Sequence, residues 1–189
     1  DKPILSYWIV IGFSYIFGLS RWALRFPSAI AGLLSIWCSY KICSILSNKR
    51  TGALAAWMLA TAVFFMYWTR VASADMLNTG GTLLAVTVFL IRKDRLNFTS
   101  YITIFFIITF TALCKGLVSP VVVFLMILPI ILRDRQWKEY FKPSMFIALI
   151  ICIILYILPF YISSHTDNLY HYKESGLYEV FRENVLRYF

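Results

Sequence analysis

A short polar break interrupts an otherwise apolar sequence at Arg70-Val71-Ala72-Ser73-Ala74-Asp75-Met76. The apolar run Ala53–Thr69 precedes it, and the apolar run Leu77–Ile91 follows it. Runs of roughly 17–25 apolar residues have the length that an α-helix needs to cross about 30 Å of hydrocarbon. The sequence therefore predicts two membrane-spanning helices that meet at a membrane surface, with an acid and a base in the connection.

The composition of the whole chain agrees with a membrane location. Of the 189 residues, 60% are hydrophobic, 18% are aromatic and 14% are charged, whereas about a quarter of the residues in a soluble domain are charged. The hydrophobic residues are gathered into blocks, and the polar residues lie between the blocks. We therefore expect an all-α fold, a polytopic membrane helix bundle in a cell membrane.

The basic residues and the cysteines argue against two other classes of protein. The formal net charge of +9 comes from short basic clusters between apolar blocks, which is the pattern of membrane loops. These clusters form no contiguous basic face, so we expect no nucleic-acid partner. The four cysteines lie inside apolar runs, where cysteine behaves as a small hydrophobic residue, so we expect neither a disulfide nor a metal cluster from them.

The apolar blocks predict about six transmembrane helices within residues 20–163, in a single domain that covers residues 1–189. Ser20 is a suitable N-cap for the first of these helices. Pro27 is expected to kink it, which membrane helices tolerate. The six predicted spans are Ser28–Leu46, Ala53–Thr69, Met76–Ile91, Phe98–Cys114, Val121–Leu132 and Ser144–Ile162.

The two ends of the chain differ from these spans. Pro3–Phe17 is short and carries interfacial aromatic residues, so we expect an interfacial helix within residues 1–19; a tilted span is the alternative. Residues 164–189 are polar and aromatic, and they predict an outer-face segment. The first residue is Asp1 rather than Met, so we expect the chain to be a piece of a longer protein.

Basic residues fall in every second connection between the predicted spans, and the positive-inside rule places these connections in the cytoplasm. The remaining connections, Arg70–Asp75 and Lys115–Pro120, then face outward with the C-terminal segment and Asp1. This parity requires that Pro3–Phe17 does not cross the membrane. The cytoplasmic connections carry Lys49 and Arg50, then Arg92, Lys93 and Arg95, and finally Arg133, Arg135, Lys138 and Lys142.

The predicted outer face also holds cations that the positive-inside rule does not explain. Ionisable groups at a membrane boundary are costly, which makes them functional candidates. The alternative is that they reach lipid headgroups or pair with Asp75, Glu179 and Glu183. Several cations beside apolar spans suit an anionic lipid with a long tail, because arginine and lysine bind phosphate oxygens. These cations are Lys2, Arg21, Arg25, Arg70, Lys115, Arg182 and Arg187.

Four motifs follow one another along the predicted outer face. The first joins Lys2–Trp8 (KPILSYW) to Gly18–Ala29 (GLSRWALRFPSA), and the second is Arg70–Leu77 (RVASADML). The third is Leu113–Val118 (LCKGLV), and the fourth is Glu183–Phe189 (ENVLRYF). They resemble KPPLYYW with FG(V/L)SEWALRLPSALAG, R(L)A(T)TDMLL, LTKGPV and ENLxRF of the GT-C glycosyltransferases that use polyprenol-phosphate sugars. The nearest group is that of the bacterial aminoarabinose (lipid A) transferases, related to the protein O-mannosyltransferases.

The sequence departs from this family at several positions. Family members carry an earlier transmembrane helix and a first outer loop with the acidic residue proposed as general base, both expected before Asp1. Ile4 replaces the second Pro of KPP, and Leu117 replaces the Pro of KGP. The one cofactor that the resemblance suggests is a divalent metal, with Asp1 as candidate ligand. Arg182 and Asn184 occupy the neighbourhood where some members carry a metal-binding His.

The resemblance implies an inverting sugar transfer, in which an acceptor hydroxyl or phosphate attacks the sugar C1 and polyprenyl phosphate leaves. Lys2 and Arg187 would stabilise the leaving phosphate, and Arg70 and Lys115 are further candidates for phosphate binding. Asp75 is the candidate catalytic residue. It would orient the donor or acceptor sugar, hold Arg70 or Lys115 in place, or act as the base itself.

The same resemblance implies the partners and the location. The partners are a polyprenyl-phosphate-linked sugar donor, a lipid acceptor of lipid A type or a protein acceptor, and membrane lipids. The location is the bacterial inner membrane, with the active site facing the periplasm or the exterior. No ATP or nucleotide sugar is available there, so the donor must already be carried across on a lipid.

Two other functions remain open from the sequence. A lipid or polyprenyl-phosphate transporter predicts ionisable residues at mid-span and inverted repeats, but inside the predicted spans the only charge is Lys41, near one end. A non-catalytic membrane assembly subunit predicts outward cations that are scattered. The enzyme predicts instead that Lys2, Asp75, Lys115 and Arg187 line a common cavity.

Overall fold

The structure, a computed structural model, describes residues 4–134 and 140–166. Most residues in these ranges are helical and none forms a strand, which confirms the predicted all-α, polytopic fold. The helices are α1 Ile4–Phe17, α2 Arg21–Leu46, α3 Lys49–Thr61, α4 Val63–Thr69, α5 Ala74–Arg92, the 3₁₀ turn η1 Lys93–Arg95, α6 Phe98–Lys115, α7 Val118–Asp134 and α9 Pro143–Thr166.

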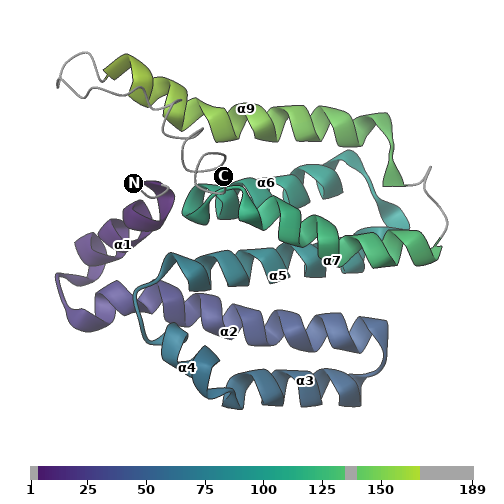
Figure 1. Cartoon of the computed structure of the whole chain (residues 1–189), viewed down its shortest axis with the longest axis horizontal. Helices are drawn as coiled ribbons and strands as arrows, with labels where there is room; N and C mark the ends of the chain where they lie inside the picture. Colours follow the sequence, from purple (N-terminus) through teal and green to yellow (C-terminus); the bar gives the residue numbers. More distant parts are fainter. Residues whose placement is uncertain (1–3, 135–139, 167–189) are drawn as a thin grey trace, which may run out of the picture.

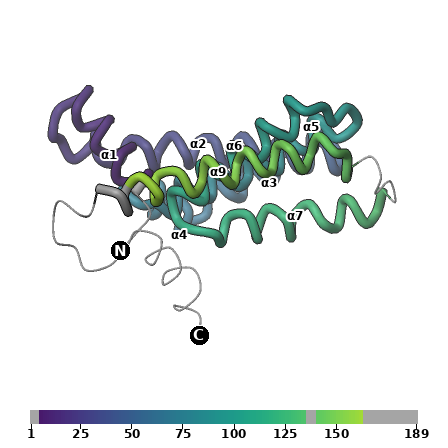
Figure 2. Tube along the Cα trace, turned by 90° about the horizontal axis from the view of Figure 1, so that it is seen from above, coloured from purple at the N-terminus to yellow at the C-terminus, as the bar shows by residue number. Residues whose placement is uncertain are grey.

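The long helices lie side by side in the order α3, α2, α5, α6 and α9 (Figure 1). Seen from above, α7 lies to one side of these helices, where it packs on α5 and α6 (Figure 2). The buried core sits between α5, α6, α7 and α9, and it includes Val86, Ile104, Val123 and Ala148. The outward sides of the helices carry exposed Ile, Leu, Phe and Trp residues, as expected where lipid is the solvent.

Small residues bring α2 and α5 into close contact. A Cβ atom built on Gly80 of α5 would lie 3.0 Å from the carbonyl oxygen of Ala31 on α2. Small residues at such positions let the backbones of membrane helices approach each other. This contact sets the distance between α2 and α5 next to the polar break at residues 70–75.

Four helices are long and apolar enough to cross a membrane: α2, α5 with η1, α6 and α9. The predicted span over Ala53–Thr69 is bent, because α3 and α4 meet at an angle of 68°; together they form a broken span or a re-entrant loop. At the bend Ala62 has an extended backbone, and the Thr61 hydroxyl donates to the Trp57 carbonyl 2.9 Å away. If the bent pair counts as one span, the described residues offer up to five; the total of six stays a prediction, since α7 has 17 residues.

The first long helix begins earlier than the predicted span Ser28–Leu46. It starts at Arg21, and Ser20 caps it as predicted, accepting a hydrogen bond from the Ala23 amide at 3.3 Å. Pro27 therefore lies inside α2, in its second turn. Within the 14-residue α1 the rise is only about 21 Å, which agrees with an interfacial helix, although its position in the membrane stays a prediction.

The connections fall at two ends of the bundle (Figure 1). One end holds Arg70–Asp75 and Lys115–Gly116, and we call it the motif end. The other, the basic end, holds Lys49 and Arg50, the segment Arg92–Arg95, and Arg133. The fold thus separates the predicted site from the basic connections, as the positive-inside pattern requires.

A polar cluster fastens the basic end. The Tyr140 hydroxyl donates to Asp134 Oδ2 at 2.7 Å, and Lys93 approaches the same oxygen at 3.4 Å. The Tyr101 hydroxyl in turn donates to the Tyr140 carbonyl at 3.0 Å. These contacts link η1, the end of α7 and the start of α9, with α6 as the support.

Candidate functional site

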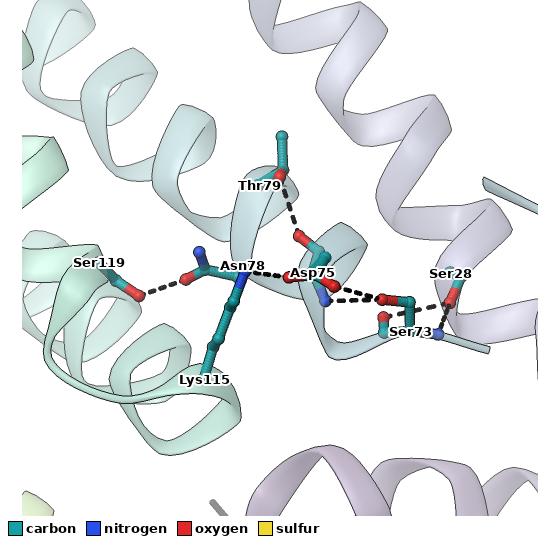
Figure 3. Close-up of polar contacts among 7 residues, drawn as sticks. All are labelled: Ser28, Ser73, Asp75, Asn78, Thr79, Lys115 and Ser119. Carbon is teal, nitrogen blue, oxygen red and sulfur yellow. Dashed lines mark hydrogen bonds and ion pairs between the residues drawn. The ribbon is translucent and has the colours of Figure 1, made fainter. Parts of the chain in front are cut away.

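Asp75 lies in the first turn of α5, where the Ser73 side chain caps the helix (Figure 3). Ser73 Oγ accepts from the Asp75 amide at 3.0 Å and donates to Asp75 Oδ2 at 2.9 Å. A negative side chain in the first turn is favoured by the helix dipole. The capping serine therefore fixes both the start of the helix and the direction of the carboxylate.

Lys115 lies at the end of α6, and its ammonium group forms an ion pair with Asp75 Oδ1 (Figure 3). Gly116, with φ of 101°, ends the helix directly after it in a backbone conformation that other residues rarely adopt. The two side chains are 44% and 43% exposed. An ion pair this open to solvent contributes at most about 1 kcal/mol to stability, so it is accessible to a ligand and not needed mainly for folding.

Two hydrogen-bonded contacts hold the start of α5 against its neighbours. Ser28 of α2 contacts the backbone of Ser73. On the other side, the hydroxyl of the fully buried Ser119 in α7 donates to Asn78 Oδ1 (Figure 3). Together these contacts fix the first turns of α5 between α2 and α7.

The structure brings together two of the predicted site residues, Asp75 and Lys115. Arg70 ends α4 in the same polar break and is exposed, and no hydrogen bond or ion pair of its side chain joins it to another described residue. Three further predicted site residues, the phosphate ligands Lys2 and Arg187 and the metal ligand Asp1, lie outside the described residues. Their convergence on the pair stays a prediction.

Ser28, Ser73, Asn78 and Ser119 belong to the site but are missing from the prediction. Ser73 carries a usable signal, because a serine just before a helix with an acidic residue two positions later is typical of an N-cap. For Ser28 no such signal exists, since it contacts backbone atoms 45 residues away. No group of three His, Cys, Asp or Glu side chains that would hold a metal occurs within 4–134 and 140–166.

An apolar cavity of about 430 Å³ lies between α6, α7 and α9. Leu117 and Pro120, two and five positions after Lys115 in the sequence, line it near the motif end. Leu96 and Tyr140 line it near the basic end. The cavity thus has apolar lining residues near both ends of the bundle.

The comparisons with known proteins concern the family and the fold. The family model described as dolichyl-phosphate-mannose-protein mannosyltransferase matches residues 1–162. None of the curated proteins matches the chain.

Two solved structures are similar in fold. ArnT from Cupriavidus metallidurans in the apo state superposes with a TM-score of 0.72 at 20% sequence identity, over 92% of this chain and 34% of that one. ArnT from the same organism bound to undecaprenyl phosphate gives a TM-score of 0.75 at 20% identity, over 96% and 34%. The chain therefore spans about a third of the length of these structures.

Proposed function

The chain belongs to the dolichyl-phosphate-mannose-protein mannosyltransferase family, a family of GT-C glycosyltransferases, and on this premise we propose that it forms part of an enzyme that transfers a sugar from a polyprenyl-phosphate carrier. The acceptor is a lipid of lipid A type or a protein. The carrier is supported by the similar fold of a protein solved with undecaprenyl phosphate. The basic end lies in the cytoplasm, and the motif end faces the periplasm of a bacterial inner membrane.

The observation that carries this proposal is the accessible ion pair between Asp75 and Lys115 at the motif end. The two residues are 40 positions apart in the sequence and come from different helices. Neither side chain is buried, so the pair is open to a ligand at the motif end. Charged groups at the motif end and an apolar cavity within the same bundle match the two parts of a polyprenyl phosphate, its phosphate head and its hydrocarbon tail.

The reaction is an inverting displacement at the sugar C1. A bond forms between C1 and an acceptor oxygen, and the bond between C1 and the phosphate oxygen breaks. Lys115 and Arg70 bind the phosphate with Lys2 and Arg187, so that the charge on the leaving group is stabilised. The acceptor proton passes to a carboxylate base, and Asp75 orients the sugar and holds Lys115 toward the phosphate.

The part of the carrier tail nearest the phosphate lies in the cavity between α6, α7 and α9. Its volume of about 430 Å³ falls in the usual range of small-molecule sites, about 300–1,000 Å³. The lining is almost wholly apolar, apart from groups such as the Thr109 hydroxyl. Burying hydrocarbon there is favourable by roughly 25 cal/mol for each Å² removed from water.

The proposal is tested with the full-length protein in detergent or vesicles, supplied with a radiolabelled polyprenyl-phosphate sugar. We expect Lys115→Ala and Asp75→Asn each to reduce transfer by about 10²-fold or more, the scale of a lost electrostatic group in an active site. Because the pair is exposed, the thermal midpoint of unfolding should hardly change.

The matched control is Lys93→Ala, which breaks the corresponding Lys–Asp pair at the basic end, where Lys93 contacts Asp134. This variant should retain wild-type transfer. Wild-type turnover in both Lys115→Ala and Asp75→Asn, or equal losses in all three variants, would contradict the assigned roles. A full-length protein that transfers no sugar from any polyprenyl phosphate would contradict the proposed function itself.

A further inference from the structure

A serine of α2 binds the backbone of the residue that starts α5. Ser28 Oγ accepts a hydrogen bond from the Ser73 amide at 3.1 Å and donates one to the Ser73 carbonyl at 3.4 Å (Figure 3). The Ser28 residue is 2% exposed, so both contacts are shielded from water. The Ser28 hydroxyl thus binds both the amide and the carbonyl of Ser73, a residue 45 positions later in the sequence.

The contacts continue from Ser73 to the ion pair. Ser73 holds Asp75 Oδ2 at 2.9 Å, which leaves Oδ1 directed at Lys115 (Figure 3). Ser28, Ser73, Asp75 and Lys115 therefore form one connected series that runs from α2 through α5 to α6. A shift of Ser73 moves the carboxylate with it.

The cap of α5 does not itself require Ser28. An N-cap needs only the side chain of the capping residue, and Ser73 supplies it. Ser73 has an extended backbone, with φ of −133° and ψ of 134°, so its amide points away from the helix, whereas the carbonyl of an N-cap residue commonly accepts the first helical hydrogen bond. Ser28 gives these groups a partner on α2, where α2 and α5 also meet at Ala31 and Gly80.

We propose that Ser28 is a positioning residue of the transferase: it fixes Ser73 on α2 and thereby orients the Asp75 carboxylate toward Lys115. This inference rests on the proposed function. According to this proposal, Ser28, which is buried and lies outside the polar break, controls how Asp75 and Lys115 are placed relative to each other. Misplacing a catalytic group by about 1 Å can cost about 10²-fold in rate.

The variant Ser28→Ala removes the hydroxyl, and Ser35→Ala is its matched control. Ser35 is also a fully buried serine of α2, but its hydroxyl donates to the Ala31 carbonyl of the same helix at 2.7 Å. In the full-length enzyme, Ser28→Ala should lower kcat by about tenfold to a hundredfold, with the KM for the carrier within about twofold of wild type. For Ser35→Ala, kcat should stay near wild type.

Two further measurements separate positioning from general stability. Hydrogen exchange at the amides of Ser73 and Asp75 should become faster in Ser28→Ala and stay unchanged in Ser35→Ala. In an Asp75→Asn background, Ser28→Ala should cause no further loss of the residual kcat, because Ser28 acts through Asp75. If Ser28→Ala does not accumulate, Ser28→Thr keeps the hydroxyl and should retain kcat, while Ser28→Val, of similar size, should lose it.

The inference is overturned if Ser28→Ala keeps the wild-type kcat, or if Ser35→Ala lowers kcat by as much as Ser28→Ala does. It is also overturned if Ser28→Ala lowers the residual kcat of Asp75→Asn further. Unchanged exchange at Ser73 would also overturn it. An inactive wild-type enzyme would instead contradict the proposed function and this inference together, so the two failures are distinguishable.

Discussion

The bundle carries a Lys–Asp pair at each end, and the surroundings of the two pairs differ. At the motif end, Asp75 and Lys115 are each more than 40% exposed. At the basic end, Lys93 and Asp134 are 29% and 26% exposed, and Tyr140 adds a hydrogen bond to the same carboxylate. The second pair is thus tied into a packed tyrosine, which itself is 6% exposed. This difference predicts that the Asp134 pair serves stability and that the Asp75 pair serves a ligand.

Asp134 should make the stability of the protein depend on acid. The hydrogen bond from Tyr140, and then the contact with Lys93, lower the pKa of Asp134 below its ordinary value, while burial raises the pKa of Tyr140 to about 12. The folded protein binds this carboxyl proton less readily than the unfolded chain, so the contact stabilises the fold above the ordinary pKa of about 3.9. That stabilisation is lost as the pH falls through the lowered pKa.

The measurement is the thermal midpoint of unfolding in detergent between pH 7 and pH 3, for wild type and Asp134→Asn. The wild type should have the higher midpoint at neutral pH, and the difference should shrink below about pH 4. Asp94→Asn, an exposed carboxylate of η1, serves as control. A difference between wild type and Asp134→Asn that stays constant down to pH 3 would refute the assignment.

At the scale of the helices, the contact between α2 and α5 depends on a missing side chain. A Cβ at Gly80 would press against the backbone of Ala31, whereas a Cβ at Gly12 in α1 would meet nothing within 4 Å. Inserting atoms into a packed contact costs typically about 1–3 kcal/mol. The backbone of α2 cannot yield as a flexible side chain would, so the helices themselves must move apart.

Gly80→Val should therefore lower the free energy of unfolding by about 1–3 kcal/mol, and it should also reduce transfer, because Ser28 and Ser73 are carried on the same two helices. Gly12→Ala should leave both quantities near wild type. The measurements are thermal unfolding and the transfer assay. A neutral Gly80→Val would show that α2 and α5 have room to adjust.

Much of each helix was predictable from hydropathy, and the exceptions have physical reasons. The fourth predicted span, Phe98–Cys114, differs from α6 by one residue, since polar residues bound it on both sides. Ser20 was predicted as the N-cap of α2, and it caps this helix; only the membrane-spanning part was predicted to begin after Pro27, at Ser28, although a membrane helix accommodates a proline. The bend at Ala62 has neither proline nor glycine at its centre, so no residue type in the sequence predicts it.

The site, too, has residues that the sequence predicted and contacts that it could not predict. Asp75 and Lys115 stand out as charges beside apolar runs, and a contact between them was one of the roles that the sequence left open for Asp75. The contact between Ser28 and Ser73 uses a hydroxyl and two backbone groups, which leave no pattern in residue types. Such a contact becomes visible only when the helices are placed in space.

At the scale of the whole molecule, the orientation in the membrane is the prediction with the widest consequences. Single cysteines replacing the exposed residues Ala72, at the motif end, and Asn97, at the basic end, would report it. With a thiol reagent that does not cross the inner membrane, Ala72→Cys should be labelled in cells with a permeable outer membrane. Asn97→Cys should be labelled only after the inner membrane is disrupted.

The native cysteines provide the background for this experiment. Cys38, Cys114 and Cys152 are buried, and Cys43 is partly buried, so little labelling of the unmodified protein is expected. The reverse pattern, with Asn97→Cys labelled in cells whose inner membrane is intact, would place the basic end outside and contradict the proposed orientation.

The size of the cavity beside α6 also bears on how the enzyme would discriminate between carriers. A space of about 430 Å³ accommodates a short stretch of hydrocarbon, whereas a long polyprenol must leave its distal isoprene units among the acyl chains of the bilayer. Units that never touch protein contribute nothing to selectivity. Carriers that differ only in their far ends should therefore be used equally well, and preference for length should appear only among carriers too short to fill the cavity.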